Sequence, residues 1–161
     1  MKTFKRKLHA KVLRELTLEL ETAQHAAEQA HATATDEENK AENKYDTLGL
    51  EAAYLAQGQS QRVLECEKKV FDFNKLQPKT YSHDDAIGHL ALVELINERG
   101  RKHIFISPAG GGCEIFLGGE KVNVVSPQAP LGKALLGKYL GDEVHIKAGH
   151  DTSYFEISDL K

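Results

Sequence analysis

Two segments of the chain place residues at alternating steps of three and four, which is the heptad spacing of paired helices. The first segment consists of Leu13, Leu16, Leu20, Ala23, Ala27 and Ala30. The second consists of Leu48, Ala52, Leu55, Gln59, Arg62 or Val63, Cys66, Val70 and Phe73. Bulky residues begin the first segment and end the second, so their sizes match only if the helices pair antiparallel. The pattern therefore predicts an N-terminal helical hairpin, a coiled coil with about 30 residues per helix and a length of about 45 Å.

The C-terminal half has short alternating and β-branched runs instead, which are typical of strands. The expected strands cover 88–96, 102–107, 113–117, 121–125, 143–147 and 153–157. Turns at 97–100 and at Gly118-Gly119 join four of them into two hairpins. Leu131 and Leu135 are spaced for one short helix, with Gly137 as its C-cap. The expected fold class is α+β, with the hairpin over 1–78 and an antiparallel β domain with one short helix over 79–161.

Composition excludes several classes of protein. The chain has 161 residues and a net charge of −3, so it does not bind nucleic acid through net charge alone. Cys66 and Cys113 are far apart and lack a C-x-x-C partner, which indicates a reducing cytoplasm and neither a zinc site nor a disulfide framework. We expect a cytoplasmic protein without a membrane partner, because no apolar run approaches about 18 residues and no signal peptide is evident.

The start of the chain is basic. No acidic residue precedes Glu15, and the cations are Lys2, Lys5, Arg6, Lys7, Lys11 and Arg14. Two interpretations remain open at this point. The segment is either the solvated start of a helix or a patch that attracts a phosphate backbone or an acidic protein groove.

A dense group of carboxylates lies between the two predicted helices. Thr35 and Glu38 have the spacing of a capping box, and the acids of this segment are Asp36, Glu37, Glu38, Glu42 and Asp46. An EF-hand is excluded because Ala41 occupies the position that requires glycine. The cluster is either a solvated hairpin tip or a set of oxygen ligands carried to Mg²⁺ on another molecule, since Mg²⁺ takes only one or two protein carboxylates.

Other candidate motifs fail. The triple glycine at 110–112 is not a P-loop, because no Gly-Lys-Ser/Thr follows it. The histidines show no i, i+4 ligand pair on a convincing helix, and Ser107 and Ser126 lack nucleophile-elbow glycines. We therefore expect no active site of the chain's own, no cofactor and no metal bound in the free protein.

The run from Ser126 to Gly137, followed by Gly141-Asp142-Glu143-Val144, resembles the C-terminal signature of the GreA/GreB transcription elongation factors. The resemblance implies an N-terminal antiparallel coiled coil and a C-terminal domain similar to FKBP proteins. It also implies an accessory factor to bacterial RNA polymerase. The globular part docks at the rim of the secondary channel, and the finger enters the channel, where tip acids help the polymerase to hydrolyse backtracked transcript.

Carried over by motif, the resemblance assigns roles to two groups of residues. At the tip, Glu42, Asn43 and Tyr45 match the family, whereas Asn39 stands where the family has an aspartate. An amide is a poor substitute for an anionic Mg²⁺ ligand, so Asp36, Glu37 and Glu38 are expected to assist Glu42 at the Mg²⁺ held by the polymerase, beside the RNA 3′ end. The expected docking residues are Pro130, Leu131, Gly132, Lys133, Leu135 and Leu136.

Three alternatives accompany this reading. A regulator with the same fold could occupy the channel and inhibit the polymerase without promoting cleavage. A peptidyl-prolyl isomerase would fit an FKBP-like sheet, but the chain has no tryptophan and lacks the expected aromatic pocket. A plain coiled-coil interaction protein would tolerate neutralised tip acids.

Overall fold

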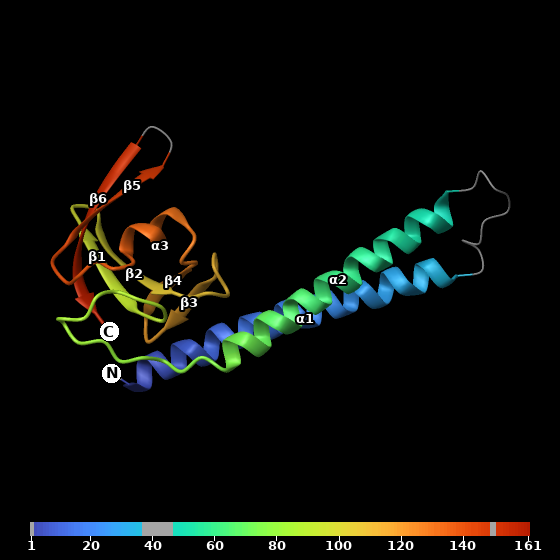
Figure 1. Cartoon of the computed structure of the whole chain (residues 1–161), viewed down its shortest axis with the longest axis horizontal. Helices are drawn as coiled ribbons and strands as arrows, with labels where there is room; N and C mark the ends of the chain where they lie inside the picture. The colour runs from blue at the N-terminus through green and yellow to red at the C-terminus, as the bar shows by residue number, and fades with distance from the viewer. Residues whose placement is uncertain (1, 37–46, 149–150) are drawn as a thin grey trace. The chain divides into compact units, whose positions relative to one another are not determined.

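The computed structural model describes residues 2–36, 47–148 and 151–161 (Figure 1). Its elements are α1 (Lys2–Thr35), α2 (Leu48–Asn74), β1 (Leu92–Asn97), β2 (Gly100–Ile106), β3 (Glu114–Leu117), β4 (Glu120–Val125), α3 (Pro130–Leu135), β5 (Glu143–Ala148) and β6 (Asp151–Leu160). One compact unit is Arg14–Lys75, and the other combines Met1–Leu13 with Leu76–Lys161. The division into domains after residue 78 stays a prediction.

In the first unit, α1 and α2 lie side by side as the predicted antiparallel hairpin (Figure 1). The inner surface of α1 follows the predicted heptads. Leu16, Ala23 and Ala30 are buried, and the intervening seam positions Leu13, Leu20 and Ala27 are half-buried. Beyond Leu20 the shielded positions of α1 are therefore all alanines, as the heptad pattern predicted.

The inner surface of α2 corrects one part of the prediction. Leu48 and Leu55 are exposed, and the inward positions are Gly49, Ala52, Ala56, Gln59, Val63, Cys66, Val70 and Phe73. Counted backward from Phe73, the steps between these positions alternate strictly between three and four residues. Leu48 and Leu55 lie outside this alternation, which places both leucines on the outer side of α2.

The second unit contains a six-stranded sheet in the order β3-β4-β2-β1-β6-β5. The two predicted hairpins, β1–β2 and β3–β4, are present. The sheet is mixed, however, where a wholly antiparallel one was expected, because β2 and β4 pair in parallel. After β2, residues 107–113 lead to β3 at the edge of the sheet and leave the position beside β2 empty. The chain then turns back, and β4 fills that position between β3 and β2, antiparallel to β3 and parallel to β2.

One face of this sheet forms the core with α3. Leu135 of α3 is fully buried among side chains such as Val93, Ile104 and Ile157. The segment before β1 adds Tyr81 and Ile87 to the same core, and backbone bonds tie it to the end of α3, with Ile87 N donating to the carbonyl of Lys138 at 2.8 Å. The helix is therefore held at both its packed face and its C-terminal end.

The first strand begins four residues later than the sequence suggested, at Leu92 instead of residue 88. Leu90 has a φ of 60°, in the left-handed region, and Ala91 N donates to the carbonyl of Gly88 at 3.3 Å. This turn interrupts the apolar run before the strand starts. The FKBP-like character of the domain stays an expectation. No helix among the described residues is both long enough and apolar enough to cross a membrane.

Candidate functional site

Most of the predicted tip lies outside the described residues: Glu37, Glu38, Asn39, Glu42, Asn43 and Tyr45. The structure describes the two helix ends that lead to it. Thr35 is the last residue of α1, and its hydroxyl donates to the carbonyl of His31 at 2.9 Å. Asp36 follows and is exposed. Thr47 precedes α2, with its carbonyl accepting from Glu51 N at 2.9 Å.

The shaft of the hairpin is held by its seam and by one group of charges. The Glu19 carboxylate of α1 lies 3.1 Å from an Arg62 guanidinium nitrogen and 3.3 Å from the Lys69 ammonium, both on α2. Exposed pairs of this kind contribute little each, so they align the helices more than they stabilise them. Cys66 is buried in the seam, and burial raises the pKa of its thiol, with the Glu19 charge adding to the effect. The thiol is therefore kept in its protonated, unreactive form.

The predicted docking residues divide into an inner and an outer set. Leu135 and Gly132 are buried, and Leu131 and Leu136 pack against the core. A Cβ at position 132 would lie 2.1 Å from the carbonyl oxygen of Ser126, so α3 can approach this turn only through glycine. Pro130 and Lys133 are exposed. A partner at this surface would thus meet the outer set, while the inner set fixes its position.

Two exposed residues beside α3 were missed by the sequence reasoning. Lys138 and Tyr139 follow Gly137, whose φ of 79° ends the helix region, and Tyr139 N donates to the Asp142 carboxylate at 2.9 Å. An aromatic residue two positions after a predicted C-cap glycine was the signal available for Tyr139.

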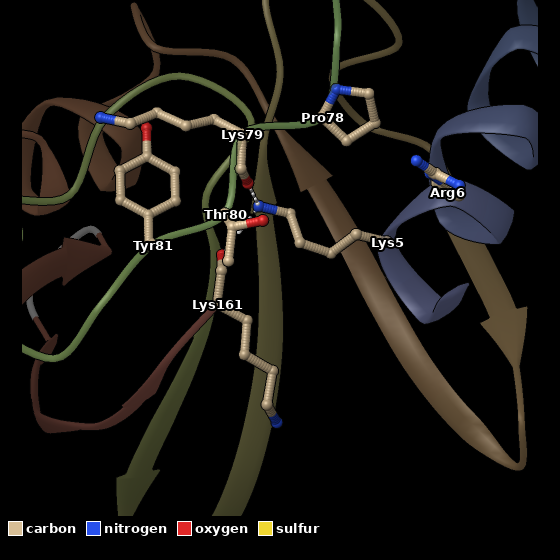
Figure 2. A pocket seen from close by; sticks show the side chains of 7 residues that line it. All are labelled: Lys5, Arg6, Pro78, Lys79, Thr80, Tyr81 and Lys161. Atoms are coloured by element: carbon tan, nitrogen blue, oxygen red, sulfur yellow. Dashed lines mark hydrogen bonds between the residues drawn. The ribbon is translucent and has the colours of Figure 1, made fainter. Parts of the chain in front are cut away.

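The basic start of α1 has two members that serve the fold. Lys5 is only 6% exposed, and its ammonium donates to the carbonyls of Lys79 and Lys161, the latter at 2.9 Å (Figure 2). Burial, helped by the nearby Lys79 charge, lowers the pKa of Lys5 to about 8. Lys11 donates to the carbonyl of Phe116 at 2.5 Å. Neither ammonium is thus fully solvated. The interpretation of this segment as a solvated helix start therefore does not hold for Lys5 and Lys11.

A small cavity opens beside Lys5, with a volume of about 210 Å³. It is lined by Lys5, Arg6, Pro78, Lys79, Thr80, Tyr81 and Lys161 (Figure 2). The Tyr81 ring lies 5.0 Å from the Lys5 ammonium and 4.7 Å from that of Lys79, so it offers a π face to both cations. The arrangement fastens the start of α1 to the segment that enters the sheet.

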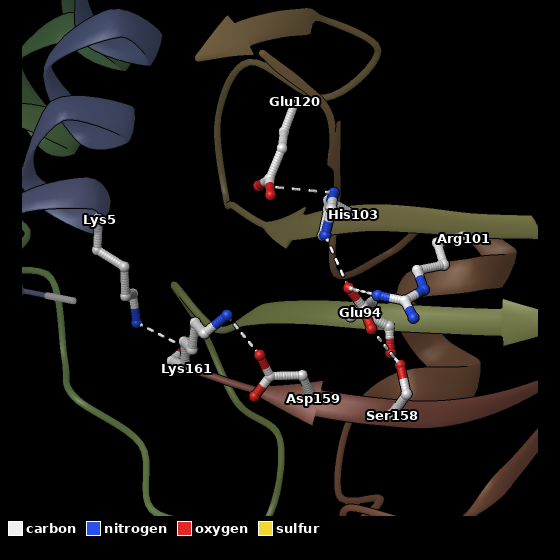
Figure 3. Close-up of polar contacts among 8 residues, drawn as sticks. All are labelled: Lys5, Glu94, Arg101, His103, Glu120, Ser158, Asp159 and Lys161. Atoms are coloured by element: carbon white, nitrogen blue, oxygen red, sulfur yellow. Dashed lines mark hydrogen bonds and ion pairs between the residues drawn. The ribbon is translucent and has the colours of Figure 1, made fainter. Parts of the chain in front are cut away.

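A polar cluster lies across β1, β2 and β6 (Figure 3). Glu94 is its centre: its carboxylate accepts from the Ser158 hydroxyl at 2.7 Å and lies 3.1 Å from His103 Nε2. Arg101 is 3.9 Å away from the same carboxylate, and His103 Nδ1 lies 3.9 Å from Glu120. The hydrogen bond from Ser158, followed by that from His103, lowers the pKa of Glu94 despite its partial burial.

The cluster borders a cavity of about 340 Å³. Ser158 donates to a carboxylate and not to the imidazole, so this serine is not arranged as an activated nucleophile. Half of the cluster was predictable, because a hairpin turning at 97–100 places Glu94 opposite His103. Ser158 was not, since its strand reaches β1 from the far end of the chain. Among the described residues, no group of three metal-binding side chains is positioned to hold an ion.

Residues 118–161 match the model of a protein family described as transcription elongation factor, GreA/GreB, C-term. This segment contains the signature read in the sequence and confirms the resemblance there. No curated protein matches the chain.

Several solved structures are similar to it. One is the GreA factor homolog 1 (Gfh1) protein of Thermus thermophilus, with 19% identity over 92% of this chain and 94% of that chain at a TM-score of 0.39. Thermus aquaticus Gfh1 has 20% identity over 94% and 92%, with a TM-score of 0.40. A prokaryotic transcription elongation factor GreA/GreB from Nitrosomonas europaea has 18% identity over 64% and 89%, with a TM-score of 0.37.

Proposed function

We propose that this chain is a Gre-type transcription factor that binds bacterial RNA polymerase through the secondary channel and stimulates cleavage of backtracked transcript. The match of residues 118–161 to the GreA/GreB C-terminal domain carries the proposal. Two further features support it: a slim helical hairpin, and a sequence between its helices that is rich in carboxylates. In this proposal the reaction takes place on the polymerase, and the chain supplies oxygen ligands to the Mg²⁺ held there.

Each part of the chain has a role in the proposal. The sheet and α3 dock at the channel rim, with Pro130 and Lys133 as the exposed members of the docking set. The hairpin spans the channel, and its alanine seam keeps the pair of helices narrow. Glu42 then acts at the metal and the RNA 3′ end, assisted by the acids at 36–38.

A transcript-cleavage assay on stalled polymerase complexes tests this role. The wild-type chain should accelerate shortening of the RNA, and Glu42→Ala should slow the accelerated reaction by about 10- to 100-fold, as is typical when a group supporting a metal site is removed. Glu28→Ala, which removes an exposed acid from the α1 shaft, is the matched control and should leave the rate unchanged. Equal rates for Glu42→Ala and wild type would count against the proposal.

One observation favours a second candidate, a channel-binding regulator that inhibits the polymerase without promoting cleavage. Asn39 occupies the position of an expected carboxylate ligand. If this amide prevents metal binding, the wild-type chain will bind the polymerase and slow initiation or elongation without shortened transcripts. Asn39→Asp should then introduce cleavage, whereas in the first candidate it should only increase an activity that is already present.

A further inference from the structure

The side of α2 that faces away from α1 carries a second row of residues at heptad spacing. We call it the outer stripe, and its members are Leu50, Tyr54, Gln57, Gln61, Leu64, Lys68 and Phe71. The four apolar members are between 56% and 65% exposed. Within the described part of α2, every position of the inner seam is shielded and every other position is exposed. The outer stripe is therefore not required for pairing with α1.

The outer surface of α1 is different. Leu18, at 44%, is the exposed large hydrophobic residue of that helix among those the structure describes. Its outward neighbours one to three turns away include Glu15, Glu21, His25 and Glu28, all exposed. The two helices of the hairpin thus present different chemistry to their surroundings: a charged side on α1, and on α2 four large apolar residues among charged and polar ones.

The spacing of the outer stripe indicates the shape of its occupant. Steps of four and three from Leu50 to Phe71 are the spacing at which one helix receives the side chains of another. The row covers about 30 Å of helix, which is about six turns. Single exposed leucines are ordinary on protein surfaces, but here two apolar pairs share one side of the helix, Leu50 with Tyr54 and Leu64 with Phe71, and Gln57 and Gln61 separate them. Apolar anchors at this period are what a helix-binding surface presents.

The charges beside the stripe indicate the chemistry of its occupant. Glu51, Glu65 and Asp72 border one side at seven-residue intervals, with Gly58 completing the series. A Cβ at Gly58 would meet nothing within 4 Å, so this side is open. Two cations lie at the C-terminal end of the stripe: Lys68 is a member of it, and the Lys75 ammonium lies 3.7 Å from the centroid of the Phe71 ring. The three carboxylates outnumber them and disfavour a nucleic-acid backbone. They also disfavour a second copy of the chain, because antiparallel pairing of two outer stripes would bring Glu51 beside Asp72 of the copy.

We propose that the outer stripe is a docking surface for an α-helix of bacterial RNA polymerase that carries apolar residues at heptad spacing, bordered by lysine or arginine. This inference rests on the proposed function, in which polymerase surrounds the hairpin. It adds that α2, and not α1, contacts the protein. Apolar side chains of the polymerase helix pack between Leu64 and Phe71 and between Leu50 and Tyr54, and its basic residues meet Glu51, Glu65 and Asp72.

The test compares variants on the two helices for binding to purified core polymerase, with the equilibrium constant measured directly. The double variant Leu64→Gln with Phe71→Gln should weaken binding by at least about tenfold, because truncating buried anchors of an interface commonly has this effect. Leu18→Gln is the matched control on α1 and should bind like wild type. Glu65→Lys should weaken binding more than Glu21→Lys, which makes the same change of charge on α1. Far-ultraviolet circular dichroism confirms that each variant is folded.

The outcomes separate the two proposals. If the wild-type chain does not bind polymerase, the proposed function fails and this inference fails with it. If the wild-type chain binds and the stripe variants bind equally well, or if Leu18→Gln is as damaging, the proposed function stands and the outer stripe is not the docking surface. A dimer seen by sedimentation and abolished by Leu64→Gln would also overturn the inference, since the occupant would then be a second copy.

Discussion

Lys5 shows how a residue that looks solvated in the sequence can belong to the interior. It lies in a row of cations, yet its ammonium is buried against two backbone carbonyls. The energetic consequence is a pKa of about 8, against an ordinary value of 10.5. Between these two values the unfolded chain binds more protons than the folded chain, so the free energy of unfolding rises with pH in this window.

We therefore expect the stability difference between wild type and Lys5→Met to change with pH. From about pH 8 to about pH 10.5 the wild type should gain up to about 3 kcal/mol relative to the variant, and below pH 8 the difference should be constant. Urea denaturation at a series of pH values measures this. Lys7→Met removes an exposed charge nearby and should show no such trend. A difference that stays flat across the window would show that Lys5 is solvated, and one that falls would show that folding raises its pKa; either would contradict the account.

Single residues were predictable from sequence where the local register decides their partners. A turn at 97–100 is enough to place Glu94 opposite His103. Ser158 and Lys161 could not be placed, because they reach β1 and α1 only through pairings distant in sequence. The burial of Lys5 could not be predicted either. Its ammonium donates to backbone carbonyls, and the side-chain pattern of a sequence does not indicate where such carbonyls lie.

At the scale of the element, α3 depends on one close approach. Gly132→Ala would normally stabilise a helix by about 1 kcal/mol. Here the new methyl group would lie 2.1 Å from the Ser126 carbonyl oxygen and 3.0 Å from Pro127 Cα, so backbone must move. We expect the variant to lose about 1–3 kcal/mol of unfolding free energy, as overpacked sites do.

Gly58→Ala on α2 is the control for that measurement. Its added methyl meets nothing within 4 Å, and its backbone is helical, so it should gain about 1 kcal/mol. Both variants can be compared by urea denaturation. If Gly132→Ala were as stable as wild type, the turn at Ser126 would have room that the structure does not show.

The helices and strands were predicted better than the way they pair with one another. The two helices, the short helix and all six strands were expected close to where they lie, because each has its own period or turn signals. The parallel pairing of β2 with β4 was missed, since a seven-residue connection is compatible with either a neighbouring or a skipped strand position. The inward positions of α2 near Leu48 were also predicted wrongly, because apolarity favoured Leu48 and Leu55, whereas the smaller Gly49 and Ala56 are the shielded residues there.

At the scale of the whole molecule, the sequence predicted a helical hairpin followed by a sheet with one helix, and both are present. The family resemblance came from a local motif at 126–137 and 141–144 that requires no knowledge of the fold, and the family model matches residues 118–161 around it. What the pattern did not reveal was the asymmetry of the hairpin. That asymmetry depends on which positions of α2 face α1, because the remaining positions form the outer side of the helix.

The central claim is that residues near position 42 reach the catalytic Mg²⁺ of RNA polymerase while the sheet stays outside the channel. An iron chelate attached at a single cysteine tests this most directly, because hydroxyl radicals cut only what lies near the iron. The chain would carry Glu42→Cys in a Cys66→Ala, Cys113→Ser background, and a second preparation would carry Glu143→Cys on β5 instead.

The account predicts that the chelate at position 42 cuts the polymerase subunits around the catalytic Mg²⁺ and the RNA near its 3′ end. The chelate at position 143 should cut neither. Cuts at the active centre from position 143, or none from position 42 in a complex shown to be bound, would contradict the account.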